Sequence, residues 1–254
     1  YKDCGDVDII VITAGAPPKQ GQTRLDTLEL SAKICKSIVD PIMESGFDGI
    51  FLVISNPVDI ITHYVQFLSG LPKNQVIGTG TAIDSARLQN MIAQIAKVDP
   101  RSVHAYSMGE HGDSQMVPWS TVTVAGKPFY DVIADNKELV GDVDLDELVY
   151  KTTQEGWEIL NRKGTTYYGI ATACAGIIKA ILNDENRIIP VSTLLEGEYG
   201  EKDVYAGVPT VLNRYGASDV LEIHMTPGEL SRFKESTKVI REYTDRILEI
   251  HKSL

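Results

Sequence analysis

Two continuous apolar runs constrain the fold of this chain more than any other feature. The segments "DIIVITAGA", from Asp8, and "GIFLVISNP", from Gly49, end in small or turn-forming residues, as do strands buried on both faces of a parallel sheet. Between them, apolar residues recur at helical spacing at Leu25, Leu28, Ala32, Cys35, Val39 and Ile42. A strand, a helix and a strand in this order predict βαβ units and a doubly wound parallel sheet.

The rest of the chain predicts a mixed architecture. "QVIG" reads as a third short strand, and a helix over 82–97 leads away from it. After Pro100 we expect a hairpin in "STVTVAGKPF", helices over 145–162 and 165–183, and an antiparallel meander of "RIIPVSTLLEGEYG", "DVYAGVPTVLN" and "GASDVLEI". A capping box, Thr226-Pro227-Gly228-Glu229, opens the last helix. The predicted fold class is α/β: the second half of a Rossmann-type doubly wound parallel sheet, followed by an α+β domain with an antiparallel sheet.

One motif of such a sheet is missing from the chain. No G-x-G-x-x-G occurs, although this motif opens the first half of a dinucleotide-binding sheet. Because one βαβ unit takes about 30 residues, the first half needs roughly 60 to 90 residues ahead of Tyr1. We therefore expect the sequence to begin inside a domain.

Composition and charge exclude several function classes. The 254 residues, 43% hydrophobic and 23% charged, suit a globular protein with one or two cores. The chain has no apolar run of about 18 residues and no signal peptide, so we expect it in the cytoplasm. A formal net charge of -11 without a basic block argues against nucleic acid as a partner. The scattered Cys4, Cys35 and Cys174 argue against a disulfide framework or a zinc cluster.

The segment "SMGEHGDS" contains the candidate proton carrier, His111. A catalytic histidine needs a carboxylate to orient it and a cationic group to hold a substrate. Asp84 and Arg87 in "IDSAR" are three residues apart on a predicted helix, so they share one face. They form either a surface ion pair or a functional pair, in which a buried carboxylate raises the imidazole pKa and the guanidinium binds a substrate carboxylate. Spacing alone does not choose between these readings.

Two further polar residues follow loops or strand ends. Arg24 ends the Pro- and Gly-rich segment "PPKQGQT", whose composition suits a moving lid, and its alternative role is a solvated arginine at a helix start. Asn56 ends the second apolar run, at the edge of an open sheet where ligand contacts concentrate. The alternative for Asn56 is an Asx-type cap.

Five blocks, in order, resemble the signature blocks of the L-lactate and malate dehydrogenase family, in particular its bacterial lactate and 2-hydroxyacid branch: "ITAGAPPKQGQTRLD", "VISNPVD", "GTGTAIDSAR", "GEHGDS" and "KGTTYYGIA". The likeness covers essentially the whole chain. It implies an NAD-dependent oxidoreductase of glycolysis and fermentation that interconverts pyruvate and L-lactate. Residues 1–80 are then the C-terminal half of the NAD-binding domain and 81–254 the substrate domain, with helix 165–183 packing back on the former.

The resemblance also implies a role for each candidate residue. His111 is the proton donor and acceptor, Asp84 orients its ring, and Arg24 polarises the reacting carbonyl. Substrate-binding positions are Arg87 for the carboxylate, Asn56 for the carbonyl beside the nicotinamide, Thr166 as a pocket lining, and Pro18. Positions that match NAD contacts are Gly15, Ala16, Ser37, Ile54, Ser55, Asn56 and Thr79. Without the first strands the pyrophosphate site is lacking, so we expect the segment as given to be inactive alone.

The substrate-selecting position departs from the family pattern. It is usually glutamine in lactate enzymes and arginine in malate enzymes, whereas this chain has Pro18. Without a cation to pair a second carboxylate, malate and oxaloacetate are disfavoured, because a buried unpaired charge is costly. Lys19 or Gln20 supplies a polar contact if the loop folds differently. We rank pyruvate and lactate first and broader 2-hydroxy acids, of the 2-hydroxyisocaproate type, second.

A second departure concerns regulation. Family members activated by fructose 1,6-bisphosphate carry an arginine two residues after the substrate-binding one, and this chain has Gln89 there. His104 matches the histidine that precedes the "GEH" block, although it is equally explained as a histidine at a subunit interface. Losing a phosphate-pairing charge weakens binding, so we expect activation to be weak or absent.

A catalytically silent structural or binding protein of the same fold has no need of the His111, Asp84, Arg87 and Arg24 set. An NAD-dependent glycosidase has a related sheet but expects a metal-binding Cys/His arrangement, and we predict no metal site. The resemblance implies a homodimer or homotetramer built through helices 25–45 and 145–163.

Overall fold

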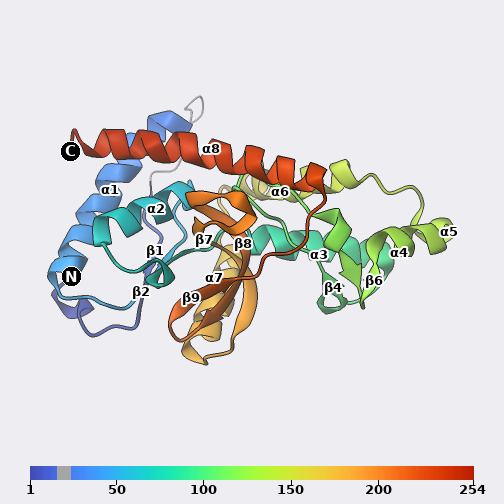
Figure 1. The fold of residues 1–254 in the computed structure, drawn as a ribbon, viewed down its shortest axis with the longest axis horizontal. Helices are drawn as coiled ribbons and strands as arrows, with labels where there is room; N and C mark the ends of the chain where they lie inside the picture. Colours follow the sequence, from blue (N-terminus) through green and yellow to red (C-terminus); the bar gives the residue numbers. More distant parts are fainter. Residues whose placement is uncertain (16–23) are drawn as a thin grey trace.

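The larger of two sheets in the described part of the protein has six strands, in the order β1-β2-β3-β7-β8-β9, and the smaller has three, in the order β4-β5-β6. The computed structural model describes residues 1–15 and 24–254. Helices lie on both faces of the sheet, and both chain termini lie at the same end of the molecule (Figure 1). The predicted α/β fold is confirmed.

The first three strands are parallel and follow the predicted βαβ order. They are β1 (Ile9–Ile12), β2 (Ile50–Val53) and β3 (Val76–Gly78), joined by α1 (Arg24–Glu44) and α2 (Val58–Ser69). Ile12 pairs with Val53, and Val53 with Gly78. The carboxyl ends of all three strands therefore meet at one edge, where ligands bind in sheets of this kind.

The three long strands form the predicted antiparallel meander. They are β7 (Arg187–Glu196), β8 (Lys202–Asn213) and β9 (Gly216–Val220). This meander does not form a separate sheet, because Gly78 of β3 pairs with Ser192 of β7. A Cβ added at Gly78 would lie 2.9 Å from the Ser192 Cβ and closer still to the Thr62 hydroxyl, so the close approach of the two strands requires glycine.

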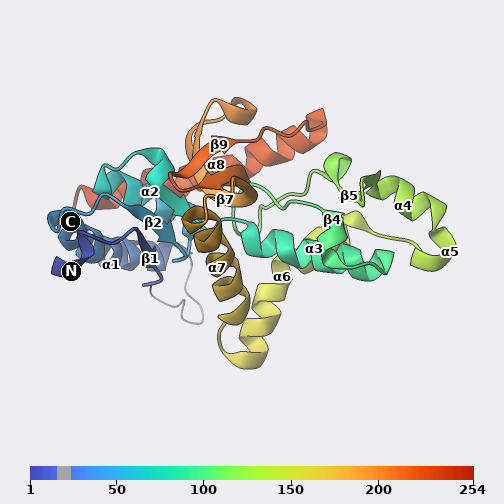
Figure 2. The same cartoon turned by 90° about the horizontal axis from the view of Figure 1, so that it is seen from below.

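Side chains alternate between the two faces of the sheet, as the pleat requires. Phe51 and Val53 pack toward α1, α2 and α8 (Pro227–His251), in a core that includes all the periodic apolar residues of α1 from Leu28 to Ile42. Ile50, Leu52 and Ile77 pack on the other face, against Cys174, Ile177, Ala180 and Ile181 of α7 (Tyr168–Leu182). The sheet is thus covered by helices on both sides (Figures 1 and 2).

The remaining elements extend away from the sheet (Figure 2). They are α3 (Ala82–Ala96), β4 (Val103–His104), β5 (Thr123–Val124), β6 (Lys127–Pro128), α4 (Phe129–Asp135), α5 (Lys137–Val140) and α6 (Leu145–Lys163). Short 3-10 turns lie at Lys2–Cys4, Lys73–Gln75, Pro100–Ser102, Trp119–Thr121 and Glu198–Gly200. This region has its own apolar core, which includes Leu88, Val103, Trp119, Phe129 and Leu148.

Helix ends agree with the predictions at most positions. The capping box at Thr226 and Glu229 is present at the start of α8, and Gly164 ends α6 in the left-handed conformation, with φ 83°. The helix predicted from Thr165 begins later, at Tyr168, so Thr166 lies in the loop between α6 and α7. No helix among the described residues combines the length and apolar character needed to cross a membrane.

Candidate active site

The loop that carries His111 is closed at its base and tied to the sheet. Met108 and Met116 exchange two backbone hydrogen bonds, of 2.8 and 2.9 Å, so the chain between them forms a closed loop. Gly109 pairs in the same way with Gly207 of β8, at 2.9 and 2.8 Å. A backbone fixed by four such bonds holds the imidazole in a defined place before any side chain acts on it.

The His111 ring is oriented by Asp84. The Nδ1 atom of His111 lies 2.6 Å from Asp84 Oδ2, and an ionised carboxylate only accepts hydrogen bonds. Nδ1 therefore carries a proton and donates a hydrogen bond to Asp84. Nε2 is then the nitrogen that exchanges a proton with a ligand. The Asp84 side chain is 2% exposed and that of His111 24%, so the proton-exchanging ring keeps access while its partner is buried.

Arg87 completes this group from the same helix. Its Nη1 atom lies 3.3 Å from Asp84 Oδ1, and its side chain is 12% exposed. The two residues are three apart on α3, as the spacing predicted, but they do not form the surface ion pair that was one of the two readings. The carboxylate lies between an imidazole and a guanidinium in a buried site.

Burial and charge oppose each other at these residues. Burial pushes the Asp84 pKa upward, but His111 and then Arg87 outweigh it, so the carboxyl pKa lies below its ordinary value. Burial alone would lower the His111 pKa, but the charge and hydrogen bond of Asp84, with the charge of Asp59, outweigh burial and the repulsion by Arg87. The His111 pKa is therefore raised, which favours imidazolium near neutral pH.

A second buried carboxylate, Asp59, also contacts this loop, and the sequence reasoning missed it. Its Oδ2 accepts the His111 backbone N–H at 2.8 Å, and its Oδ1 accepts the Ser192 hydroxyl at 2.5 Å. Burial raises the pKa of Asp59 to about 6. Asp59 ends the block "VISNPVD" and lies in the first turn of α2, but an acidic residue at a helix start occurs equally in exposed helices.

The strand ends contain several of the predicted NAD contacts. Ser55 donates its hydroxyl to the Ala14 carbonyl at 2.6 Å, which ties the end of β2 to the end of β1. Ile54 and Thr79 continue the parallel pairing, through bonds of 2.9 Å from their N–H groups to Ile12 and Val53. Ile54, Ser55 and Thr79 therefore lie at one edge of the sheet.

This edge fits a dinucleotide. Among the described residues, a Cβ added at Gly15 would meet only the Ser55 Cβ, at 3.9 Å, so this part of the structure leaves the glycine backbone open to close approach by a ligand. Asn56, which follows Ser55, is exposed. Open backbone and polar side chains at the carboxyl ends of parallel strands are the features that a dinucleotide uses.

The other predicted site residues lie on α1, in the loop before α7, or outside the described residues. Ser37 is exposed on α1, and its hydroxyl donates to the Ile34 carbonyl of its own helix at 2.8 Å. Thr166 is exposed in the loop before α7. Arg24 is the first residue of α1. Ala16 and Pro18 lie outside the described residues.

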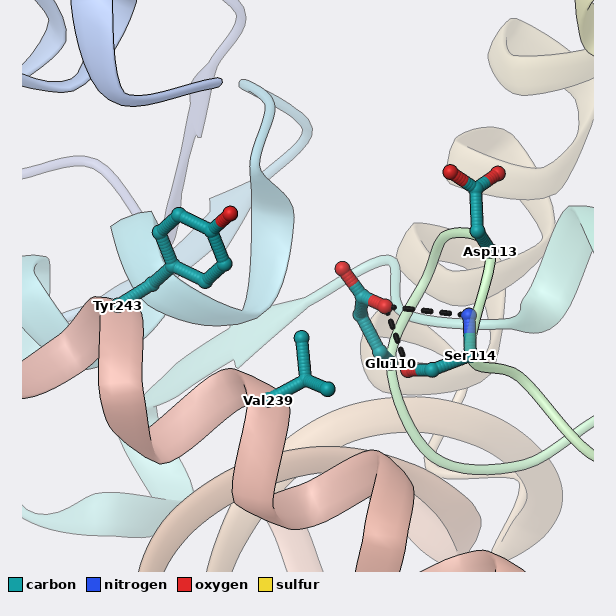
Figure 3. A pocket seen from close by; sticks show the side chains of 5 residues that line it. All are labelled: Glu110, Asp113, Ser114, Val239 and Tyr243. Atoms are coloured by element: carbon teal, nitrogen blue, oxygen red, sulfur yellow. Dashed lines mark hydrogen bonds between the residues drawn. The ribbon is translucent and has the colours of Figure 1, made fainter. Parts of the chain in front are cut away.

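A cavity of about 470 Å³ lies between the His111 loop and α8. Glu110, Asp113 and Ser114 line it from the loop, and Val239 and Tyr243 from α8 (Figure 3). The Ser114 hydroxyl donates to Glu110 Oε2 at 2.5 Å. The cavity adjoins the His111 loop, but the described residues that line it include neither His111 nor Asp84.

Comparison with known protein families matches both parts of the chain. Residues 1–78 match the lactate/malate dehydrogenase NAD binding domain, and residues 81–250 match the lactate/malate dehydrogenase alpha/beta C-terminal domain. Together these matches account for nearly all of the sequence.

Individual proteins similar to this chain also belong to the lactate/malate dehydrogenase family. L-lactate dehydrogenase 3 of Bacillus thuringiensis subsp. konkukian (strain 97-27) is 56% identical over 247 residues, which is 97% of this chain and 78% of the relative. L-lactate dehydrogenase 2 of Bacillus anthracis is 48% identical, over 95% of this chain and 77% of the relative. The crystal structure of the minor L-lactate dehydrogenase from Enterococcus mundtii, with ligands bound, superposes with a TM-score of 0.92 at 44% identity, covering 97% of this chain and 78% of that one. The chain belongs to the lactate/malate dehydrogenase family.

Proposed function

We propose that this protein is an NAD-dependent L-lactate dehydrogenase that interconverts pyruvate and L-lactate. The observation that carries the proposal is the buried group of His111, Asp84 and Arg87, with contacts of 2.6 and 3.3 Å, in a chain similar throughout to L-lactate dehydrogenases. A silent protein of this fold has no use for an imidazole whose pKa is raised by a buried carboxylate.

The reaction needs a proton on oxygen and a hydride on carbon. NAD, when bound, supplies or accepts the hydride. His111 supplies the proton to the carbonyl oxygen of pyruvate from Nε2, and takes it back when lactate is oxidised. Asp84 holds the ring through Nδ1 and stabilises the imidazolium form. Arg87 binds the substrate carboxylate through its planar fork of N–H donors.

The other assigned residues bind the cofactor and the substrate. We assign Gly15, Ala16, Ser37, Ile54, Ser55, Asn56 and Thr79 to NAD. Asn56 also donates to the substrate carbonyl, and Thr166 lines the pocket. Arg24 polarises the carbonyl, where negative charge develops in the transition state.

Pyruvate is the preferred substrate in this proposal. Pro18 offers no cation for a second carboxylate, so oxaloacetate would leave a charge unpaired in the site. The same lack of polarity favours larger apolar side chains, and 2-oxoisocaproate is the second candidate substrate. The protein functions as a homodimer or homotetramer, and fructose 1,6-bisphosphate activates it weakly or not at all.

The test is NADH oxidation by the full-length chain with pyruvate, 2-oxoisocaproate, phenylpyruvate and oxaloacetate. We expect the highest kcat/KM with pyruvate. A clear preference for oxaloacetate would refute the role of Pro18, and a lack of turnover with every 2-oxo acid would refute the proposed function.

A further inference from the structure

We propose that Asp59 is a positioning residue for His111, holding the backbone of the proton carrier while Asp84 holds its ring. The inference rests on the proposed function and adds to it a residue from a different helix. Asp84 reaches His111 from α3, whereas Asp59 reaches it from the first turn of α2. The imidazole is then held by two carboxylates that act at different atoms.

Both oxygens of Asp59 are used. One accepts the His111 N–H at 2.8 Å across 52 residues of sequence, and the other accepts the Ser192 hydroxyl at 2.5 Å across 133 residues. Asp59 is 1% exposed and Ser192 is fully buried. The carboxylate therefore joins α2 and β7 to the catalytic loop, and Ser192 fixes the carboxylate in turn.

The hydrogen bonds to the His111 N–H and to Ser192 do not by themselves require a carboxylate at position 59. Asparagine at this place could accept the His111 N–H and donate to the Ser192 oxygen, without the penalty of burying a charge. Desolvation is the largest influence on the Asp59 pKa, and the Ser192 hydroxyl, the His111 backbone N–H and the His111 charge offset it only in part, while the charge of Glu110 adds to it. The structure retains a charge that destabilises the fold.

That charge acts on His111. Among the residues that the structure describes, Asp84 and Asp59 favour the imidazolium form, and Arg87 opposes it. Asp59 thus has two effects that can be separated. Its position fixes the His111 backbone, and its charge helps to keep the ring protonated at neutral pH.

The loop has other anchors that do not depend on Asp59. The Glu110 N–H donates to Ser236 Oγ of α8 at 2.8 Å, and Gly109 pairs with Gly207. Removing the Asp59 side chain should therefore loosen His111 without unfolding the loop. This makes truncation of Asp59 an informative variant.

The experiment compares Asp59→Ala, Asp59→Asn and Ser192→Ala with Thr62→Val in the full-length chain. Thr62 lies on the same helix, is fully buried and donates its hydroxyl to Val58, so its variant loses a buried hydrogen bond without touching His111. For Asp59→Ala we expect kcat with pyruvate to fall roughly 10- to 100-fold, because a displacement of about 1 Å costs about that much. The KM for pyruvate should change less than about threefold, because Arg87 is untouched.

Asp59→Asn separates position from charge. It should recover most of the kcat lost in Asp59→Ala, but the pH at which pyruvate reduction declines should move to lower values. Ser192→Ala should give a smaller loss of kcat than Asp59→Ala, and Thr62→Val should match the wild type. The proposal is overturned if kcat of Asp59→Ala stays within about twofold of the Thr62→Val control, or if the pH profile of Asp59→Asn is unchanged.

A direct titration separates this inference from the proposed function. NMR of the His111 ring in the protein without substrate reports its pKa whether or not pyruvate is reduced. Failure of the wild type to oxidise NADH with pyruvate refutes the proposed function. A His111 pKa that is equal in the wild type and Asp59→Asn refutes the effect of the Asp59 charge.

Discussion

The Nδ1 atom of His111 and the Oδ2 atom of Asp84 lie 2.6 Å apart, although 27 residues separate them in the chain. The pair forms because the first turn of α3 is tied to the start of the loop that Met108 and Met116 close: the Ser107 N–H donates to Ser85 Oγ at 2.8 Å. It fixes the tautomer of the imidazole, and Asp84 helps to raise the His111 pKa.

Asp84→Asn should shift the pH dependence of pyruvate reduction. The reaction needs the imidazolium form, which is lost as pH rises through the His111 pKa, and Asp84 raises that pKa. The variant should lose activity at lower pH than the wild type, and its kcat/KM at neutral pH should fall by about 10²-fold. The control is Asp99→Asn, which removes the exposed partner of Arg101 and should change neither quantity. An unshifted profile in Asp84→Asn contradicts the pairing.

Arg87→Lys should weaken substrate binding. Lysine carries the charge but not the planar fork that pairs with a carboxylate at two points. A charge-assisted hydrogen bond contributes about 1.5–3 kcal/mol, so the KM for pyruvate should rise roughly 10- to 100-fold. Arg101→Lys, at an exposed arginine, is the matched control. Steady-state kinetics with an unchanged KM in Arg87→Lys would remove this residue from the substrate site.

Asp59→Asn should alter how stability depends on pH. Burial raises the Asp59 pKa from 3.8 to about 6, so between these values the folded protein binds more protons than the unfolded chain. The free energy of unfolding therefore decreases as pH rises through this window, by up to about 3 kcal/mol. The variant lacks this contribution, so urea unfolding at several pH values should show it gaining stability relative to the wild type from pH 4 to about 6. If the difference in the free energy of unfolding between the variant and the wild type stays constant with pH, the buried charge of Asp59 does not destabilise the folded protein.

Fructose 1,6-bisphosphate should have little effect on the KM for pyruvate. The Gln89 amide donates to the Ala105 carbonyl at 3.0 Å, beside the exposed His104, and it offers no charge to a phosphate. Gln89→Arg should bind the sugar bisphosphate roughly 10- to 100-fold more tightly in calorimetry, because a charge-assisted hydrogen bond is gained. Gln89→Met, which adds no charge, should not. A large fall in the KM of the wild type for pyruvate on addition of fructose 1,6-bisphosphate would contradict this prediction.

The fold could be predicted because its signals are local. Apolar runs of strand length, periodic residues such as Leu28 and Ile42, and the Thr226 capping box each determine a nearby element. The junction of the two halves could not be predicted, because the β3–β7 pairing rests on Gly78 and Ser192 alone. A single bridge leaves no periodic pattern in a sequence.

The candidate site was predictable in part for the same reason. The i,i+3 spacing of Asp84 and Arg87 placed them on one face of a helix, but their burial depends on packing against residues far along the chain. The role of Asp59 could not be predicted, because its partners are a backbone N–H and a serine hydroxyl. Neither group produces a recognisable sequence pattern. The predicted helix 165–183 includes Thr166, whereas α7 begins at Tyr168, because the residue directly before Tyr168 is not of a type that marks where a helix starts.

The most direct test of the account is the proton transfer assigned to His111. We predict that His111→Gln lowers kcat/KM for pyruvate-dependent NADH oxidation by about 10²–10⁴-fold, while NADH binding measured by fluorescence is unchanged. A variant that reduces pyruvate as fast as the wild type would contradict the central claim.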